Sequence, residues 1–168
     1  MTHITDLLLD EFDAEAQKTR TTLQRVAAGN GDFAPHTKSM PLGKLAPHIA
    51  QLAAFGSIIL TEPGLDFATR TFTPLAFESA DQLVRVFDEG MAKVRTALQA
   101  TGDQKWTEPW KLSAGPRVIF EGSRFLAYRQ MFINHIVHHR AQLGVYLRLT
   151  GAPVPSTYGP SADETLGF

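Results

Sequence analysis

Cysteine is absent from this chain of 168 residues. Without a thiol the protein forms no disulfide bond, offers no cysteine nucleophile and holds no metal ion through thiolate sulfur. Any metal ion would therefore be bound through nitrogen and oxygen ligands.

An excess of charge of either sign is also missing, since 16 basic residues face 17 acidic ones and the net charge is -1. The two signs are well mixed, so no basic stripe is available for nucleic acid and no polybasic block for a membrane surface. No apolar run approaches the length of a membrane span, and the N-terminal stretch MTHITDLLLDEFDAEAQ turns acidic where a signal peptide would be apolar. We therefore expect a cytoplasmic protein with neither a nucleic-acid nor a membrane partner.

The overall composition is that of a folded globular protein. Hydrophobic residues make up 43% of the chain, charged residues make up 20%, and the mean hydropathy is -0.11. The length suits one hydrophobic core, so we expect a single domain over residues 1–168.

Helical periodicity is strong in four segments, which predicts an all-α four-helix bundle. Their bounds are about Thr5 to Ala28, Leu42 to Thr61, Ala76 to Ala100 and Ser123 to Leu149. Pro47 lies early in the second segment, so the regular helix either begins there or is kinked. The stretch KWTEPWKLSAGPRVIFEGS, before the fourth segment, is either irregular or a short hairpin.

The fourth segment carries a seam of large residues that includes two histidines. Its members, spaced alternately three and four apart, are Phe125, Tyr128, Phe132, His135, His139, Gln142, Tyr146 and Leu149. Because most of the seam is apolar or aromatic, we expect both imidazoles to face the interior near the middle of this helix.

His135 and His139 have the spacing of metal ligands on one helix face. Side chains at positions i and i+4 lie one above the other, so both imidazoles can converge on one ion. His48 occupies a seam position of the second segment, and it becomes the third ligand if these two segments are neighbours. Three histidines would leave a coordination position for water or substrate, as in catalytic sites.

Simpler interpretations exist for each histidine. A single core imidazole such as His48 is more often hydrogen-bonded than metal-bound. His138 points about 100° away from its neighbour His139, so we interpret it as a packing residue or one that supports a ligand. His3 and His36 lie at an end and in a loop with no partner pattern, and we expect them to be solvated.

Two stretches resemble the signature regions of the DinB/YfiT-like family: LAPHIAQLAAF and NHIVHHRAQLGVYLRLTGAPVPSTYGPSADE. The approach to the second helix, HTKSMPLGKLAPHIA, is similar as well, and the resemblance spans about Lys38 to Glu164. It implies a metal-binding four-helix bundle of up-down-down-up topology, often a homodimer, with nickel, zinc or iron as the metal. The triad that it implies is His48, His135 and His139, the same trio that the seams select.

The resemblance implies a metal-dependent enzyme, either a thiol-dependent S-transferase that uses a low-molecular-weight thiol and a small-molecule substrate, which is the leading interpretation, or a hydrolase. The alternative is a non-catalytic protein, either a metal-binding stress-response module or a dimeric interaction protein. The chain offers Arg129 and Arg140 as candidate positive charges for a thiolate pocket. Tyr128 and Tyr146 share the histidine seam but are interpreted as packing residues, and no general base can be named.

The proline-rich tail VPSTYGPSADETLGF is expected to be extended. It either packs back over the bundle, reaches a partner subunit or is disordered.

Overall fold

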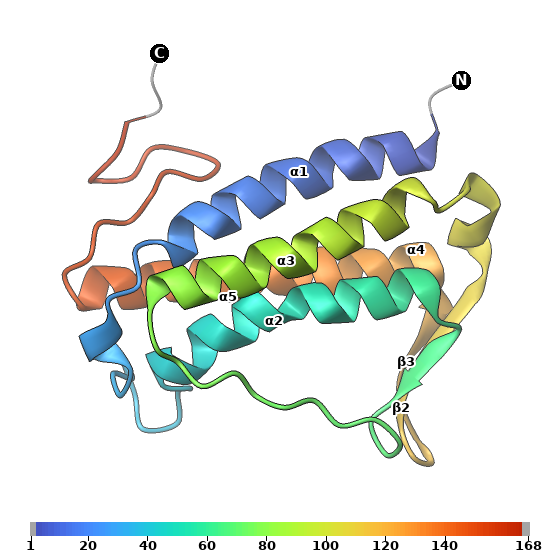
Figure 1. Ribbon diagram of the computed structural model, residues 1–168, viewed down its shortest axis with the longest axis horizontal. Helices are drawn as coiled ribbons and strands as arrows, with labels where there is room; N and C mark the ends of the chain where they lie inside the picture. Colours follow the sequence, from blue (N-terminus) through green and yellow to red (C-terminus); the bar gives the residue numbers. More distant parts are fainter. Residues whose placement is uncertain (1–2, 166–168) are drawn as a thin grey trace.

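The computed structural model describes residues 3–165. Its main body is a bundle of four long helical segments (Figure 1). The first three are α1 (Ile4–Leu23), α2 (Leu42–Thr61) and α3 (Ala80–Gln99). The fourth is made of α4 (Arg124–Ala127), the π-helix η3 (Tyr128–Ile133) and α5 (Asn134–Leu149), which follow one another without a break. Two 3-10 helices, η1 (Ala28–Asn30) and η2 (Asp103–Thr107), lie in the connections.

The bundle has the expected order of directions. α1 and the α4–α5 segment run one way, and α2 and α3 run the other way (Figure 1). α1 packs against α3 and α5, and α2 packs against the same two helices. α2 and α5 are therefore antiparallel neighbours, which is the condition that a shared histidine site requires.

A small sheet corrects the all-α prediction. It contains β1 (Gly64–Asp66), β2 (Pro109–Ala114) and β3 (Arg117–Ser123). β2 and β3 form an antiparallel hairpin, so the hairpin alternative is confirmed. Gly115 turns it with a φ of +58°, which L side chains rarely adopt. β1 pairs in parallel with β2 across a long stretch of sequence, a contact that local periodicity does not reveal.

The helix boundaries follow capping chemistry. The second predicted segment coincides with α2, which begins at Leu42 and continues through Pro47. α3 begins at Ala80 rather than at residue 76, because the Ser79 hydroxyl accepts a hydrogen bond from the backbone N–H of Gln82 at 3.2 Å. α1 ends at Leu23, five residues before the expected end at Ala28.

The π-helix changes which side of the last helix is buried. The buried stripe runs through Arg124, Tyr128, Phe132, Ile136 and Arg140 in steps of four. In an α-helix of 3.6 residues per turn such a stripe would drift around the axis, whereas the wider π turn keeps it on one side. The predicted seam is therefore wrong at both ends, where Phe125 is 39% exposed and Leu149 is 56% exposed.

Apolar stripes of the other helices fill the interior. The α1 stripe is buried at Leu8, Phe12, Thr19 and Leu23, and the α3 stripe at Leu83, Phe87, Met91, Val94 and Leu98. Trp106 and Trp110, from η2 and β2, are also completely buried beside the ends of the helices. The small sheet thus closes one end of the bundle rather than forming a separate layer.

Gly90 permits the close approach of α3 to α2, because a Cβ atom built there would lie 2.5 Å from the Cβ of Ala53. We expect Gly90→Ala to lower the free energy of unfolding by about 1–3 kcal/mol, the usual cost of overpacking. The matched control is Gly144→Ala on α5, where the new Cβ would meet only Val154 at 3.8 Å. That change should raise the free energy of unfolding by up to about 1 kcal/mol through helix propensity. Urea denaturation of both variants is the measurement, and equal effects would contradict the packing argument.

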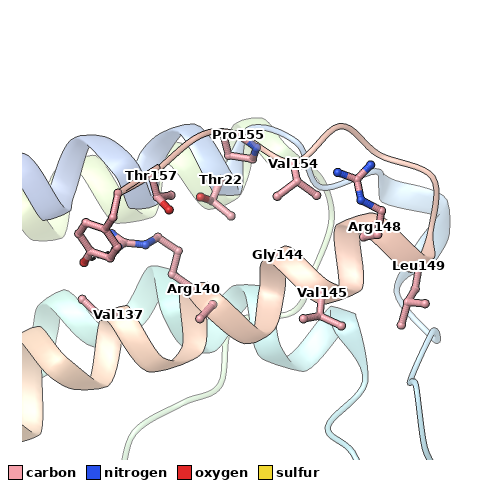
Figure 2. A pocket seen from close by; sticks show the side chains of 12 residues that line it. Thr22, Val137, Arg140, Gly144, Val145, Arg148, Leu149, Val154, Pro155 and Thr157 are labelled. Carbon is pink, nitrogen blue, oxygen red and sulfur yellow. Dashed lines mark hydrogen bonds between the residues drawn. The ribbon is translucent and has the colours of Figure 1, made fainter. Parts of the chain in front are cut away.

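The tail packs back over the bundle, as one of the three alternatives predicted; its last residues, 166–168, lie outside the described part. The Tyr158 hydroxyl donates a hydrogen bond to Glu15 of α1 at 2.7 Å, and Glu164 pairs with Arg25 at 2.6 Å. A cavity of about 450 Å³ lies between the tail and α5, with Arg140 and Val145 on the helix side (Figure 2).

The connection from β1 to α3 runs alongside α2. The side chain of Gln51 holds this connection through two hydrogen bonds of 2.9 Å. The amide nitrogen donates to the Thr73 carbonyl, and the amide oxygen accepts from the backbone N–H of Leu75. Gln51 lies one turn after His48 on α2, so this connection passes close to that end of the candidate site. None of the helices within residues 3–165 combines the length and apolarity needed to cross a lipid bilayer.

Candidate metal centre

Three histidines from two antiparallel helices converge in the bundle. His48 comes from the first half of α2, and His135 and His139 come from successive turns of α5. Their ring nitrogens all lie within 4.8 Å of one another. The structure therefore brings together the three residues that the seams and the resemblance selected.

The facing atoms are the Nε2 nitrogens. His135 Nε2 lies 2.9 Å from His139 Nε2 and 3.5 Å from His48 Nε2. Two nitrogen ligands at about 2.0–2.1 Å from a tetrahedral ion are separated by about 3.3–3.4 Å. The observed separations bracket this value, so the donor set is compatible with one divalent ion.

The other ring nitrogens determine the tautomers. His135 Nδ1 lies 3.3 Å from the Met131 carbonyl oxygen, and His139 Nδ1 lies 2.7 Å from the amide oxygen of Gln142. Both partners only accept hydrogen bonds, so each Nδ1 carries the proton and donates. Each Nε2 is then a bare lone pair in the neutral imidazole. Two lone pairs that face each other at 2.9 Å repel unless a cation lies between them.

The electrostatic environment keeps the imidazoles neutral. Burial, and then the proximity of His139 and His135, lowers the pKa of His48 from its usual 6.5 to about 4. Burial, followed by the neighbouring His139, also lowers the pKa of His135. The pKa of His139 is lowered by burial, although its hydrogen bond to Gln142 opposes the shift. Neutral imidazoles are the form that binds a metal.

The lowered pKa of His48 predicts how the stability of the metal-free protein depends on pH. Between pH 6.5 and about pH 4 the unfolded chain protonates His48 while the folded chain does not, so stability falls as the pH falls. We expect the urea midpoint of chelator-treated protein to decrease through this range. His48→Gln should flatten the decrease, because glutamine does not titrate. A decrease of unchanged steepness in the variant would show that other groups cause it.

All three ligand candidates are half-buried rather than sealed in the core, which corrects the expectation that the imidazoles face the interior. The buried stripe of α5 runs through Ile136 and Arg140, one position beyond each histidine. An ion at the three Nε2 atoms would thus lie at the flank of the bundle, where solvent reaches the side chains.

The remaining histidines do not join the cluster. His138 is exposed, and its ring lies beside that of His139 with centroids 4.9 Å apart. His3 is exposed but has a partner that the sequence did not suggest, because its Nδ1 lies 2.8 Å from Asp103 Oδ2. His36 lies in the loop before α2, where its Nδ1 accepts a hydrogen bond from the Lys38 backbone at 3.1 Å.

The candidate positive charges lie elsewhere. Arg129 pairs with Glu11, and Arg140 pairs with Glu15 at 2.6 Å, so both guanidinium groups are directed to α1 rather than to His48 on α2. The two tyrosines pack as expected. Tyr128 is completely buried, and the Tyr146 hydroxyl donates to the Met40 carbonyl at 2.9 Å.

Gln142 has a function in the structure that the sequence pattern does not predict. Its spacing predicts a position on the interior seam of the last helix, yet the side chain is exposed and orients His139 through its amide oxygen. The available signal was its position three residues after a candidate ligand, from which a side chain can reach back to the ring. The contact between His135 and the Met131 carbonyl could not be predicted in this way, because every residue type has the same backbone carbonyl.

Comparison with known proteins identifies the family and supports the fold. The model of the DinB family matches residues 1–165. The fold is similar to that of a DinB-like protein from Bacillus cereus ATCC 10987, with a TM-score of 0.67, 22% identity, and coverage of 89% of this chain and 95% of that one. A DinB-like protein from Bacillus subtilis gives a TM-score of 0.68 at 14% identity, with 90% and 97% covered. No curated protein matches the sequence.

Proposed function

Since the chain belongs to the DinB family, we propose that it is a metal-dependent enzyme whose divalent ion is held by His48, His135 and His139. The observation that carries the proposal is the pair of Nε2 lone pairs that face each other at 2.9 Å, with both Nδ1 protons committed to acceptors. Without a cation this contact is unfavourable, whereas with one it becomes bidentate coordination by a single helix.

The chain itself would supply binding and orientation. His48 contributes one ligand from α2, and the α5 pair contributes two whose rings are held by Met131 and Gln142. A divalent ion bound by three imidazoles supplies Lewis acidity, which lowers the pKa of a bound thiol or water into the neutral range. Nickel, zinc and iron all suit imidazole ligands, and elemental analysis of protein purified without added metal distinguishes them.

Thiol-dependent S-transfer is the reaction that we propose for the site. The partly exposed triad supports it, because a thiol and a second substrate need access to the fourth coordination position. In such a reaction the thiol sulfur forms a bond to an electrophilic carbon, the leaving group departs with the bonding electrons, and the thiol proton passes to solvent.

A direct test combines metal-loaded protein with a low-molecular-weight thiol, such as mycothiol or bacillithiol, and 1-chloro-2,4-dinitrobenzene as electrophile. We expect thioether formation above the uncatalysed rate, measured by absorbance, and its loss after chelation or in His135→Ala. The His138→Ala variant serves as control, because its exposed ring lies outside the Nε2 cluster. Thioether formation that survives chelation would contradict a metal-dependent transfer.

The second candidate is a non-catalytic protein that the ion stabilises. It is favoured by the origin of the ligands, since one ion would link α2 to α5 and stabilise the bundle. Protein that binds one ion, melts at a higher temperature with it and turns over none of the thiols would support this second function.

A further inference from the structure

A second hollow, besides the cavity beneath the tail, lies between α1, η2 and α4. Its volume is about 740 Å³, within the range of about 300–1,000 Å³ that is typical of small-molecule sites. The first turns of α1 and the start of α4 both lie at this end of the bundle (Figure 1). The metal candidates lie between α5 and α2, so this hollow is separate from them.

The walls of the hollow are unusually apolar for an exposed surface. Its floor is formed by Leu8 and Trp106, both almost completely buried. Its rim is formed by Leu7, Ile4 and Phe125, which are 61%, 40% and 39% exposed. Large apolar side chains that gather around a concavity mark a binding surface, whereas scattered ones need no explanation.

One wall of the hollow, formed by the charged side chains of Glu11 and Arg129, has unused hydrogen-bond donors. Glu11 and Arg129 pair across it, and Glu11 is the hydrogen-bond partner that the described residues provide for the Arg129 guanidinium. A guanidinium carries five N–H donors in a fork that fits a carboxylate, so most of its capacity is free.

Tyr128 packs behind this wall, against Trp106, and does not itself line the hollow. Its hydroxyl is buried and has no hydrogen-bond partner among the described residues, and its ring packs against Trp106 with centroids 5.5 Å apart. Burial, followed by the nearby Glu11 carboxylate, raises the pKa of Tyr128, so the hydroxyl keeps its proton and adds no charge to this wall. The free N–H groups of Arg129, which does line the hollow, therefore favour a ligand with acceptor oxygens.

We propose that this hollow binds an amphipathic anion, a carboxylate or sulfonate with a hydrocarbon body, independently of the metal centre. The body lies against Leu7, Trp106 and Phe125, and the anionic head meets Arg129. The cavity beneath the tail is a poorer candidate, because its arginines make more hydrogen bonds than the single one from Arg129 to Glu11. Arg140 binds Glu15, Thr19 and Tyr158, and both terminal nitrogens of Arg148 bind Asp163.

The test uses the full chain with 8-anilinonaphthalene-1-sulfonate as a fluorescent probe and decanoate as a competitor. We expect saturable probe binding that decanoate displaces and that decanol, with the same chain but no charge, displaces about tenfold less well. Arg129→Gln should remove most of this preference for decanoate. Leu7→Glu should lower the affinity for both ligands by about tenfold or more. Leu7 is exposed in the first turns of α1, so the substitution leaves the fold intact, which circular dichroism checks.

Val145→Glu is the matched control, since Val145 is 56% exposed and borders the cavity beneath the tail instead. Its probe affinity should equal that of the unmodified chain. Loss of binding in this variant rather than in Leu7→Glu would move the site to the tail and overturn the proposal. A halved molecular mass of Leu7→Glu in solution would also overturn it, because the apolar rim would then be an interface between two copies.

Discussion

His135→Ala is expected to abolish stoichiometric metal binding, the largest effect that we predict for any single substitution. His135 Nε2 is the nitrogen that lies close to both other ligand candidates, at 2.9 and 3.5 Å. Its loss leaves two imidazoles on different helices. Loss of supporting residues alone typically weakens metal sites by about 10–100-fold, so the loss of a ligand should cost more than about 100-fold in zinc affinity. Competition with a chelating dye measures the dissociation constant.

Two further variants calibrate this result. Gln142→Leu removes the acceptor that orients His139 but leaves all three ligands, so we expect a loss of about 10–100-fold. His138→Ala removes an exposed imidazole outside the Nε2 cluster and should leave the affinity unchanged. An equal loss in His138→Ala and His135→Ala would show that the metal is held by another set of residues.

Arg140→Ala is expected to lower the free energy of unfolding by about 3–5 kcal/mol, because it breaks an ion pair that is almost completely buried. Burial disfavours the charged form of Glu15, but hydrogen bonds from Lys18, Tyr158 and Arg140 outweigh it and hold the pKa of Glu15 below its usual value. Removal of the guanidinium leaves the carboxylate with fewer partners in the same surroundings. Urea denaturation at neutral pH gives the free energy.

Arg148→Ala provides the comparison on the same helix. The Arg148–Asp163 pair is exposed, and exposed pairs contribute about 0–1 kcal/mol. A small loss in Arg148→Ala with a large one in Arg140→Ala would establish that burial, rather than attachment of the tail, determines the cost. Equal losses would indicate that release of the tail is the common cause.

Local patterns were sufficient to predict most of the helices. α2 was predicted to the residue, and α3 differed mainly at its start, where the Ser79 cap begins the helix later than its periodicity suggests. These elements combine a regular apolar stripe with clear start or stop residues. The parallel pairing of β1 with β2 could not be predicted in this way, because Gly64 and Lys111 are joined by no local signal.

The candidate site was predicted more accurately than the helix that carries it. The i, i+4 relation between His135 and His139 holds on any regular helix, whatever its rotation about its axis. The degree of burial depends on that rotation, and η3 changes it without leaving a recognisable trace in the sequence YRQMFI. The three residues were therefore correctly grouped but wrongly placed in the core.

The π-helix has a further consequence for how this protein can vary. It allows one continuous helix to present its apolar stripe and its histidine stripe on adjoining but distinct sides. Substitutions at Ile136 or Leu143 then act mainly on folding stability, whereas substitutions at His135 or His139 act mainly on affinity for the ion. The two properties become separately adjustable along a single helix, so the ligand set can be redesigned while the interior of the bundle stays intact.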